Sequence, residues 1–380
     1  MKKTKEYYRA CGYEDVGYMP VPLSTEEEYP DYIEREVLKS VDEIQKYQNE
    51  KTSTVAFMTD IHYALNHNHT VRFQRLMRAY REIAKRVAPD MLIFGGDYTN
   101  EGCKEYKTKC FRELRALIDR EPYFPVNGNH DDGSIWDKAY ICADRATNHL
   151  THTELYKLFY NHLPKLGASF DENNPSLYYL YNDHAKKVRY VFLDACDVPY
   201  IFDEEGKLKY HAQWLFAMSQ KQLDWLCSCA LKFDEPGWSV LFVTHSLLLP
   251  AEVEHPPEIS KNMELLRRIV LAYQKGENYS ESFGEGDFAR NIYAPFQSKI
   301  RGDIIGFLVG DYHCDDVVYY DGIPLILTGN AVMYDKGAKN RVRRDGDETE
   351  LLFDVVTVNP EKRKIYVVRV GSGENREVGY

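Results

Sequence analysis

The feature that most constrains the fold is an arrangement that occurs five times along the chain. In each case a short apolar segment runs directly into residues rich in aspartate, asparagine or histidine. Short apolar segments bounded by turn residues are typical of buried strands. The sequence therefore predicts five strands with polar residues at their C-terminal ends. The polar segments are Asp60–His62, Gly96–Asp97, Gly128–Asp131, Thr244–His245 and Gly310–His313.

Segments with helical spacing separate the first three of these strands. We expect strands at 54–58, 91–94 and 122–126, with helices at 70–87 and 103–119 between them. Such an alternation indicates an α/β fold with a mostly parallel sheet. Because ligands bind at the carboxyl ends of parallel strands, the polar residues should converge at one edge of that sheet.

The rest of the chain predicts further elements. A long helix is expected at 210–232, and a flexible Gly/Glu/Asn-rich loop near 275–288. The remaining predicted strands are 177–181 and 188–193 as an antiparallel pair, 239–243, 304–309, and a meander of 317–320, 324–328, 351–358 and 364–370.

The sequence predicts an N-terminal extension and one main domain. Residues 1–50 are polar and form an N-terminal extension with an amphipathic helix at 31–48. Residues 51–380 form the main domain, in which insertions at 132–175 and 251–300 could cap the site. His67 and His69 follow the first segment and could reach the mouth of the site, although a solvated loop is favoured. Three further histidines in the first insertion are expected at the surface: His149, His152 and His162.

The composition of the chain indicates which partners the protein can bind and in which compartment it resides. The formal net charge of −11 disfavours nonspecific nucleic-acid binding. No apolar run approaches membrane-spanning length, and no hydrophobic region follows the N-terminal lysines. The eight cysteines are scattered without a paired CxxC spacing, which indicates reduced thiols. We therefore expect a soluble cytoplasmic protein that does not bind membranes.

The residue types in the polar segments indicate metal chemistry. Carboxylate, imidazole and amide oxygen ligands suit Mn, Fe or Zn. Alternation along an extended segment would direct Asp60 and His62 to the same side. One carboxylate can bridge two ions, and ions about 3.5–4 Å apart can activate water for attack on phosphorus. Glycines beside Asp97, Asn129 and Asp311 permit tight turns and close substrate approach.

The five segments in this order resemble the motifs of the calcineurin-like metallophosphoesterase superfamily. The similarity spans roughly 54–330. It implies a β-sandwich of mixed sheets flanked by helices. It also implies two divalent ions, chosen from Mn, Fe, Zn or Mg with Mn or Fe favoured.

The resemblance also implies roles for single residues. Asp60, His62 and His313 would hold one ion, and Asp97 would bridge to the second. Asn129 and His245 would hold the second ion. His130 would protonate the leaving oxygen or stabilise charge on the phosphoryl group, and Asp131 would orient His130 through a hydrogen bond.

One position departs from the family pattern. The last motif of the family carries a histidine ligand where this chain has Asp311. A carboxylate there can still bind the second ion, and it would favour a harder ion such as Mn or Mg. The alternative is that Asp311 lies outside the ligand shell and leaves the second ion weakly bound.

These features predict a hydrolase of a small phosphomonoester or phosphodiester. A nuclease of the same superfamily is a second hypothesis, which the acidic chain and the absence of a basic stripe disfavour. A non-catalytic binding protein on the same fold is a third. The sequence leaves the substrate and the oligomeric state open.

Overall fold

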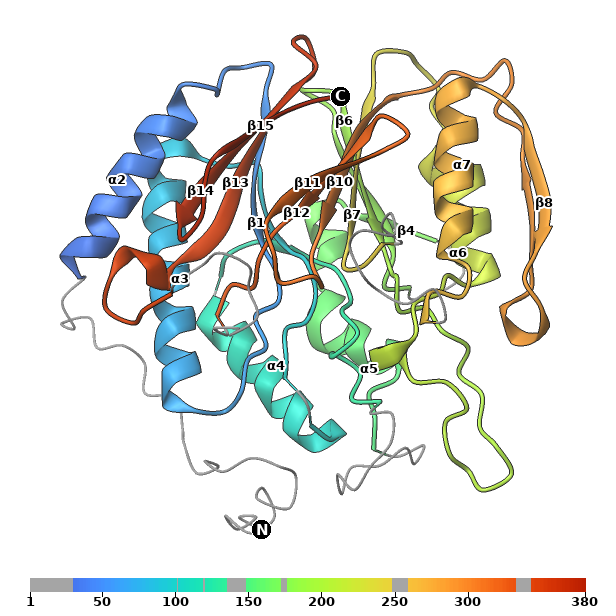
Figure 1. Ribbon diagram of the computed structural model, residues 1–380, viewed down its shortest axis with the longest axis horizontal. Helices are drawn as coiled ribbons and strands as arrows, with labels where there is room; N and C mark the ends of the chain where they lie inside the picture. The colour runs from blue at the N-terminus through green and yellow to red at the C-terminus, as the bar shows by residue number, and fades with distance from the viewer. Residues whose placement is uncertain are drawn as a thin grey trace.

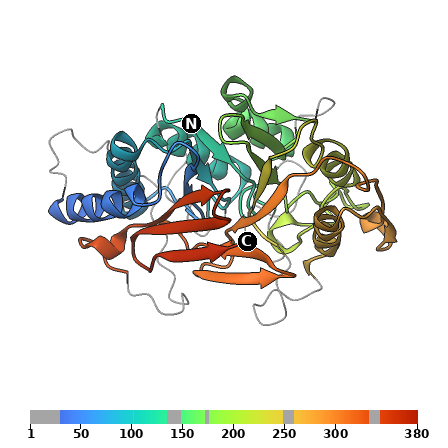
Figure 2. The same ribbon diagram turned by 90° about the horizontal axis from the view of Figure 1, so that it is seen from above.

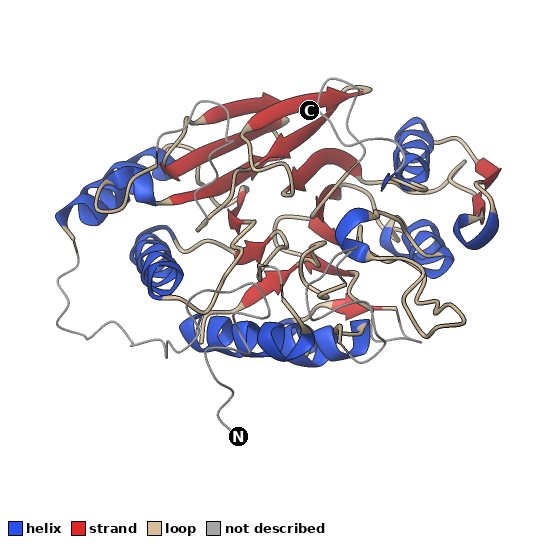
Figure 3. Ribbon diagram, turned by 60° about the horizontal axis from the view of Figure 1, so that its bottom comes forward, coloured by secondary structure: helices blue, strands red, loops and turns tan. Residues whose placement is uncertain are grey.

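The computed structural model describes residues 30–100, 102–118, 120–134, 148–171, 176–247, 259–332 and 343–380. Two mixed β-sheets form its centre, and helices lie on the outside of both (Figures 1 and 3). This is the sandwich of mixed sheets that the resemblance implied. The simpler expectation of one mostly parallel sheet was wrong, because the chain starts a second sheet after β3.

The first sheet has the strand order β15-β14-β13-β1-β2-β3. Strands β1 to β3 are parallel, whereas β13 to β15 run antiparallel as a meander beside β1. The strands are β1 (Ser53–Met58), β2 (Met91–Phe94), β3 (Tyr123–Pro125), β13 (Leu352–Asn359), β14 (Lys364–Gly371) and β15 (Arg376–Gly379). Strand β15 was not predicted from the sequence.

The second sheet has the order β11-β12-β10-β7-β6-β5-β4. Its four central strands, β12, β10, β7 and β6, are parallel. The strands are β4 (Ser169–Phe170), β5 (Tyr179–Asp183), β6 (Val188–Leu193), β7 (Ser239–Thr244), β10 (Asp303–Val309), β11 (Asp316–Tyr320) and β12 (Ile323–Leu327). The predicted antiparallel pair at 177–181 and 188–193 is confirmed as β5 and β6.

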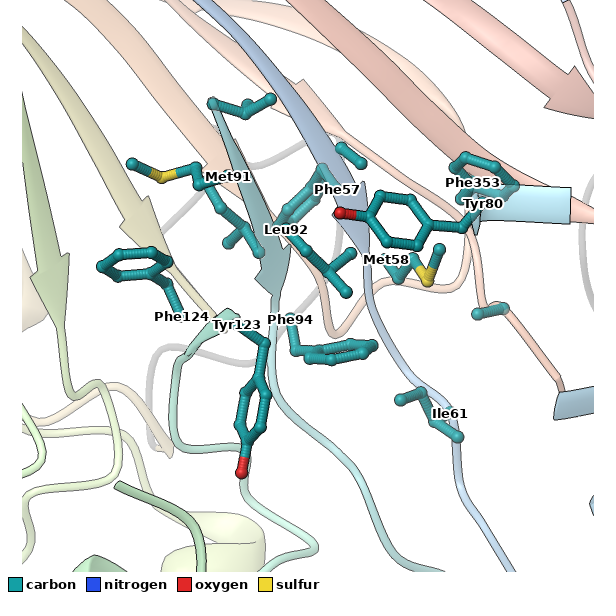
Figure 4. Close-up of a cluster of buried hydrophobic side chains, with 14 of the residues drawn as sticks. Phe57, Met58, Ile61, Tyr80, Met91, Leu92, Phe94, Tyr123, Phe124 and Phe353 are labelled. Carbon is teal, nitrogen blue, oxygen red and sulfur yellow. The ribbon is translucent and has the colours of Figure 1, made fainter. Parts of the chain in front are cut away.

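An apolar core joins the two sheets. Phe124 of the first sheet stacks on Phe192 of the second, with ring centroids 5.8 Å apart. Ser53 Oγ of β1 lies 2.7 Å from Tyr190 Oη of β6. Figure 4 shows side chains of β1, β2 and β3 clustered with Tyr80 of α3 (His67–Val87). Each fully buried large apolar side chain stabilises the fold by about 1.5–3 kcal/mol relative to exposure, so this core holds the strand ends of both sheets in fixed positions.

Helices cover the outer faces. Helix α2 (Asp31–Gln45) packs against α3 and β14, at the side of the first sheet (Figures 1 and 2). The predicted amphipathic helix in the N-terminal extension is thereby confirmed, while residues 1–29 lie outside the described part of the chain. The other helices are α4 (Lys104–Ile118), α5 (His152–Leu155), α6 (Gln220–Trp225) and α7 (Met263–Lys275), with π-helical turns at Tyr156–Tyr160 and Leu226–Ala230 and short 3₁₀ turns at Leu163–Leu166, Ala212–Trp214, Gly286–Phe288 and Glu348–Glu350.

The predicted long helix at 210–232 was wrong. Ser219 caps α6 by accepting a hydrogen bond from Gln222 N, so the helix begins only at Gln220. Before it, Phe216 N donates to Ile259 O and Met218 N donates to Asn262 Oδ1. These tertiary hydrogen bonds hold 215–219 extended, which helical periodicity cannot reveal.

The predicted flexible loop near 275–288 was also wrong. It forms the first half of a hairpin in which β8 (Tyr279–Phe283) pairs with β9 (Arg290–Ala294). Arg268 of α7 and Glu281 of β8 form an ion pair at 2.6 Å, which ties the hairpin to the helix. Among the described residues, no helix combines the length and apolar character needed to cross a membrane.

Candidate metal centre

The five polar segments meet where the two sheets come together. Those after β1, β2 and β3 come from the first sheet, and those after β7 and β10 come from the second. The site therefore lies between two sheets, not along one edge of a single sheet as the strand pattern alone predicted.

The backbone of these segments is unusual. Five of the polar residues have φ values in the left-handed region: Asp60 at 52°, His62 at 46°, Asp97 at 51°, Asp311 at 66° and His313 at 50°. The segment from Asp60 to His62 is therefore not extended, and the alternation argument for its side chains was wrong. Left-handed residues other than glycine are uncommon and concentrate at functional sites.

Hydrogen bonds hold this backbone in place. The N–H of His62 donates to Asp97 O at 2.8 Å, and that of Asp60 donates to Gly96 O at 3.1 Å. The N–H of Asp311 donates to both carboxylate oxygens of Asp60, at 3.1 and 3.0 Å. The segments after β1, β2 and β10 therefore position one another.

Glycine is required where two of the segments touch. A Cβ on Gly128 would lie 2.0 Å from the backbone nitrogen of Asp97, and one on Gly310 would lie 2.1 Å from Thr59 Oγ1. The sequence predicted glycines here for tight turns and substrate approach. In the structure, these two glycines let one motif pack directly against another.

Four side chains form the first group of donor atoms. Asp60, His62, Asp97 and His313 each offer one ligand atom, and these atoms all lie within 4.8 Å of one another. The Nε2 atoms of His62 and His313 are 2.9 Å apart, and His313 Nε2 is 3.2 Å from Asp60 Oδ1. Two imidazoles and two carboxylates directed at one point are a suitable ligand set for a divalent ion.

A second group of donors shares Asp97 with the first. Oδ2 of Asp97 lies 3.4 Å from His62 Nε2, whereas Oδ1 lies 3.3 Å from His245 Nε2. His245 Nε2 is also 2.9 Å from Asn129 Oδ1 and 3.7 Å from Asp311 Oδ1. The two oxygens of one carboxylate thus face two separate donor groups, and Asp311 lies within the second.

Neighbouring groups fix the orientation of the second set. His245 Nδ1 lies 2.8 Å from Gly95 O, so the Nδ1–H donates to that carbonyl and Nε2 faces the site. Asn129 Nδ2 donates to Gln213 O at 2.8 Å, which turns Oδ1 towards His245. Gln213 belongs to the region that was predicted as a continuous helix, so the sequence did not reveal this contact.

Burial and charge shift the ionisation of the site. Burial lowers the pKa of His62 well below its ordinary value, although the Asp97 carboxylate opposes this. Burial alone would raise the pKa of Asp97 and lower that of His245. Their mutual attraction reverses both shifts, so the pKa of Asp97 is held well below its usual range and that of His245 well above. Without a metal ion, the two residues therefore form an ion pair.

His130 lies at the open side of the site. Its side chain is 21% exposed, and its Nε2 is 4.0 Å from Asp97 Oδ2. Its ring makes an edge contact with the ring of His62, with centroids 4.9 Å apart. Because it is partly exposed and lies outside both donor groups, His130 can meet a substrate from solvent.

Asp131 has a different role from the one predicted. Its carboxylate accepts backbone N–H groups from Tyr98 at 2.8 Å, Thr99 at 3.2 Å and Gly128 at 2.9 Å. His130 Nδ1 has no hydrogen-bond partner among the described residues, so the orienting bond from Asp131 is not formed. Asp131 instead ties the segment after β3 to the segment after β2.

A family model for calcineurin-like phosphoesterases matches residues 53–329 of this chain. The chain belongs to the calcineurin-like phosphoesterase family. The family is one of phosphoric ester hydrolases, and the predicted family is confirmed.

The individual relatives share little sequence identity with this chain. A probable cyclic nucleotide phosphodiesterase from Moraxella catarrhalis (strain BBH18) is 29% identical over 83 residues, covering 22% of this chain and 29% of that protein. The phosphopantetheinyl hydrolase of Mycobacterium tuberculosis is similar over 74% of this chain and 91% of its own, with 14% identity and a TM-score of 0.37. A purple acid phosphatase from yellow lupin (Lupinus luteus) is similar over 86% of this chain and 54% of its own, with 12% identity and a TM-score of 0.45.

The calcineurin-like chain also contains site residues that the sequence did not indicate. Lys107 of α4 is buried, and its Nζ donates to Thr99 Oγ1 at 3.0 Å, to Asn100 O at 2.7 Å and to His130 O. A lysine in a helix is ordinarily assigned to a solvated face, so sequence spacing gave no signal for it.

The predicted positions of several histidines need correction. His69 lies in the first turn of α3, where its Nδ1 is 3.1 Å from His62 O, and His149 is only 1% exposed. His162 is half-buried, with its Nε2 2.8 Å from Tyr123 O. Their polarity suggested solvent, but tertiary packing buries His149 fully and His69 and His162 in part.

Proposed function

We propose that this chain hydrolyses a small phosphate ester at a centre of two divalent ions bridged by Asp97. The observation that carries the proposal is the position of the Asp97 carboxylate, with one oxygen towards His62 and the other towards His245. Asp60, His62 and His313 would complete the first ligand set, and Asn129, His245 and Asp311 the second. Mn or Fe is the favoured metal, with Zn or Mg as alternatives.

The bound ions would supply an activated water and neutralise the phosphate charge. The protein's own groups would bind and orient the ester at the open side of the site. His130, which is partly exposed and 4.0 Å from Asp97 Oδ2, would donate a proton to the leaving oxygen or stabilise charge on the phosphoryl group.

A phosphomonoester and a phosphodiester are both compatible with this chemistry. The short match to a probable cyclic nucleotide phosphodiesterase adds cyclic nucleotides to the substrates to be tested. Because that match covers 29% of the relative, it does not decide between the two classes.

The test uses full-length protein freed of metal with a chelator and then supplied with Mn²⁺, Fe²⁺, Zn²⁺ or Mg²⁺. We expect metal-dependent release of p-nitrophenol from p-nitrophenyl phosphate or its bis ester. Cyclic nucleotides, nucleotides, sugar phosphates and glycerophosphodiesters would complete the panel. Absence of turnover on all of these by protein shown to carry metal would contradict the proposal.

A matched pair of variants separates the metal centre from general effects of charge. Asp97→Asn should abolish turnover and reduce metal content, because it removes the charge shared by both donor groups. Asp303→Asn changes an exposed carboxylate that pairs with Arg363 on the surface, and should keep full activity.

Two alternatives make different predictions. A non-catalytic binding protein on this fold would carry little metal, which mass spectrometry of the purified protein would reveal. A nuclease would degrade single- or double-stranded DNA in the presence of Mn²⁺. The net charge of −11 disfavours this second alternative.

A further inference from the structure

A second group of metal-ligating side chains lies outside the centre described above. His152, Asp194 and Asp197 each offer one ligand atom, and these atoms lie within 4.8 Å of one another. His152 Nε2 is 4.0 Å from Asp194 Oδ2, and His152 Nδ1 is 3.9 Å from Asp197 Oδ1. These two distances involve different nitrogens of one ring, and only one of those nitrogens can bind a given ion. Ligand atoms about 2.0–2.2 Å from a tetrahedral ion are about 3.4 Å apart, so one atom from each residue, all within 4.8 Å of one another, leaves room for an ion.

The hydrogen bonds of the two carboxylates leave one oxygen of each available. Asp194 Oδ1 accepts from Asn127 Nδ2 at 3.1 Å and from Cys196 N at 2.9 Å. Asp197 Oδ2 accepts from Ser219 N and Gln222 Nε2, both at 3.2 Å. Among the described residues, the other oxygens make no hydrogen bond: Asp194 Oδ2 lies 4.0 Å and Asp197 Oδ1 lies 3.9 Å from a nitrogen of the His152 ring.

Among the described residues, the His152 imidazole is the cationic neighbour of Asp194. The Asp194 side chain is 1% exposed, yet no lysine or arginine of the described residues pairs with it. Burial raises the pKa of Asp194 to about 6; the nearby His152 opposes this shift and the charge of Asp197 adds to it. A buried carboxylate is costly unless it is paired or binds a metal, and Oδ2 of Asp194 is directed at the gap beside His152.

The cluster lies at the same end of the parallel strands of the second sheet as the candidate metal centre. Asp194 follows β6 directly, and β6 pairs with β7 so that Leu193 lies opposite Thr244. Asp194 therefore stands one strand away from His245. The hydrogen bond that Asp194 accepts from Asn127 connects Asp194 to the segment that carries Asn129 and His130.

We infer that His152, Asp194 and Asp197 form a site for a third divalent cation, separate from the bridged pair. Two carboxylates and one imidazole suit Mn²⁺ or Zn²⁺, and solvent would complete the coordination on the side where His152 is 28% exposed. The ion would compensate the buried charge of Asp194 and would stabilise the Asn127 segment through it.

The test counts ions per chain in the full-length protein. Metal-free protein is titrated with Mn²⁺, and separately with Zn²⁺, and bound metal is measured by mass spectrometry after desalting. We expect wild-type protein to saturate at one ion more than His152→Ala or Asp197→Asn. Anomalous scattering from crystals grown with Mn²⁺ should show a peak among these three side chains. Equal saturation of wild type and both variants, with no such peak, would overturn the inference.

Controls keep this result independent of the proposed function. His152→Ala removes no side-chain hydrogen bond among the described residues, so it should fold, and circular dichroism would verify this. Asp224→Asn alters an exposed carboxylate on α6 and should bind as many ions as wild type. Asp97→Asn should lose metal at the bridged centre but keep the peak beside His152. Loss of that peak in Asp97→Asn would contradict a separate site.

Discussion

At the scale of single residues, the candidate metal centre depends on backbone conformations that the local sequence does not favour. Left-handed backbone at a residue other than glycine costs on the order of 1–3 kcal/mol, and this centre contains five such residues. The N–H groups of Asp60, His62 and Asp311 donate to neighbouring segments, as in the bond from His62 N to Asp97 O. The fold around the site therefore has to offset local strain so that carboxylates and imidazoles converge.

His130 provides the first prediction at this scale. Replacement by alanine should reduce kcat by about 10²–10⁴-fold, as expected for loss of a general acid, while metal content stays the same because His130 lies outside both donor groups. Steady-state kinetics with the active p-nitrophenyl ester and metal analysis would measure both. His67→Ala, on the exposed first turn of α3, serves as the control. Full activity of the His130 variant would refute its assigned role.

The ion pair of Asp97 and His245 predicts how metal binding depends on pH. An ordinary imidazole has a pKa of about 6.5, and that of His245 is raised well above this value. At pH 7 the metal-free protein therefore holds a proton on His245 that an ion must displace. Affinity for Mn²⁺ should fall as pH decreases, and binding should release about one proton per chain.

Calorimetry in buffers of different ionisation enthalpy would detect that proton. The His245→Asn variant should bind Mn²⁺ more weakly than the wild type. It should also release fewer protons on binding. An affinity that does not change between pH 6 and 8, without proton release, would contradict the predicted ionisation.

At the scale of secondary-structure elements, α4 contributes to the site through one side chain. Burial lowers the pKa of Lys107, although the charges of Asp131 and Asp132 oppose the shift. The Nζ of Lys107 joins the segment after β2, through Thr99 and Asn100, to the carbonyl of His130. Helix α4 thus positions two of the metal-centre segments relative to each other.

Lys107→Met should preserve the helix but leave those three acceptors without their donor. An unsatisfied buried polar group costs about 1–3 kcal/mol, so the free energy of unfolding should fall by at least that amount and kcat should decrease more than KM changes. Urea unfolding and steady-state kinetics would measure these effects. Lys85→Met changes an exposed position on α3 and should alter neither the free energy of unfolding nor kcat. Unchanged kcat in a folded Lys107 variant would exclude a positioning role.

At the scale of the whole molecule, a buried ionic cluster connects the two sheets. Asp354 of β13 accepts from Arg369 Nε at 2.8 Å, from Arg376, and from Thr328 Oγ1 at 2.6 Å. Arg369 also pairs with Asp315, which lies two residues after His313. The cluster therefore joins β13, β14 and β15 to the segment that carries a metal-centre histidine.

The cluster predicts a pH dependence of stability. Burial alone would raise the pKa of Asp354, but Arg369 and Arg376 hold it well below its usual range. A carboxyl with a depressed folded-state pKa stabilises the fold above its unfolded-state pKa of about 3.9, and this contribution is lost as pH falls below that value. Asp354→Asn should therefore destabilise the protein by about 3–5 kcal/mol at pH 7, and its stability should fall less steeply in acid.

Chemical unfolding at pH 7 and at several values between pH 5 and 3 would measure both effects. Asp321→Asn removes a surface partner of Arg267 and should cost about 1 kcal/mol or less. An Asp354 variant with the acid dependence of the wild type would contradict this account.

The sequence by itself determined the family of the protein and most of the elements that carry the candidate site. Apolar runs predicted β1, β2, β7 and β10 almost to the residue, because buried strands need consecutive apolar side chains. The polar residues that follow those strands were all predicted as site residues, and the family they resemble is confirmed.

Tertiary structure alone decided how those residues meet. The division into two sheets, the left-handed backbone at Asp60 and His62, and the true partners of Asp131 all depend on contacts between segments far apart in the chain. The same applies to Lys107 and to His152 beside Asp194, whose polar side chains suggested solvent. Periodicity reports which faces are buried, but it carries no information about which distant segment a polar side chain will contact. For that reason the sequence could propose candidate ligands, whereas the contacts that position them required the fold.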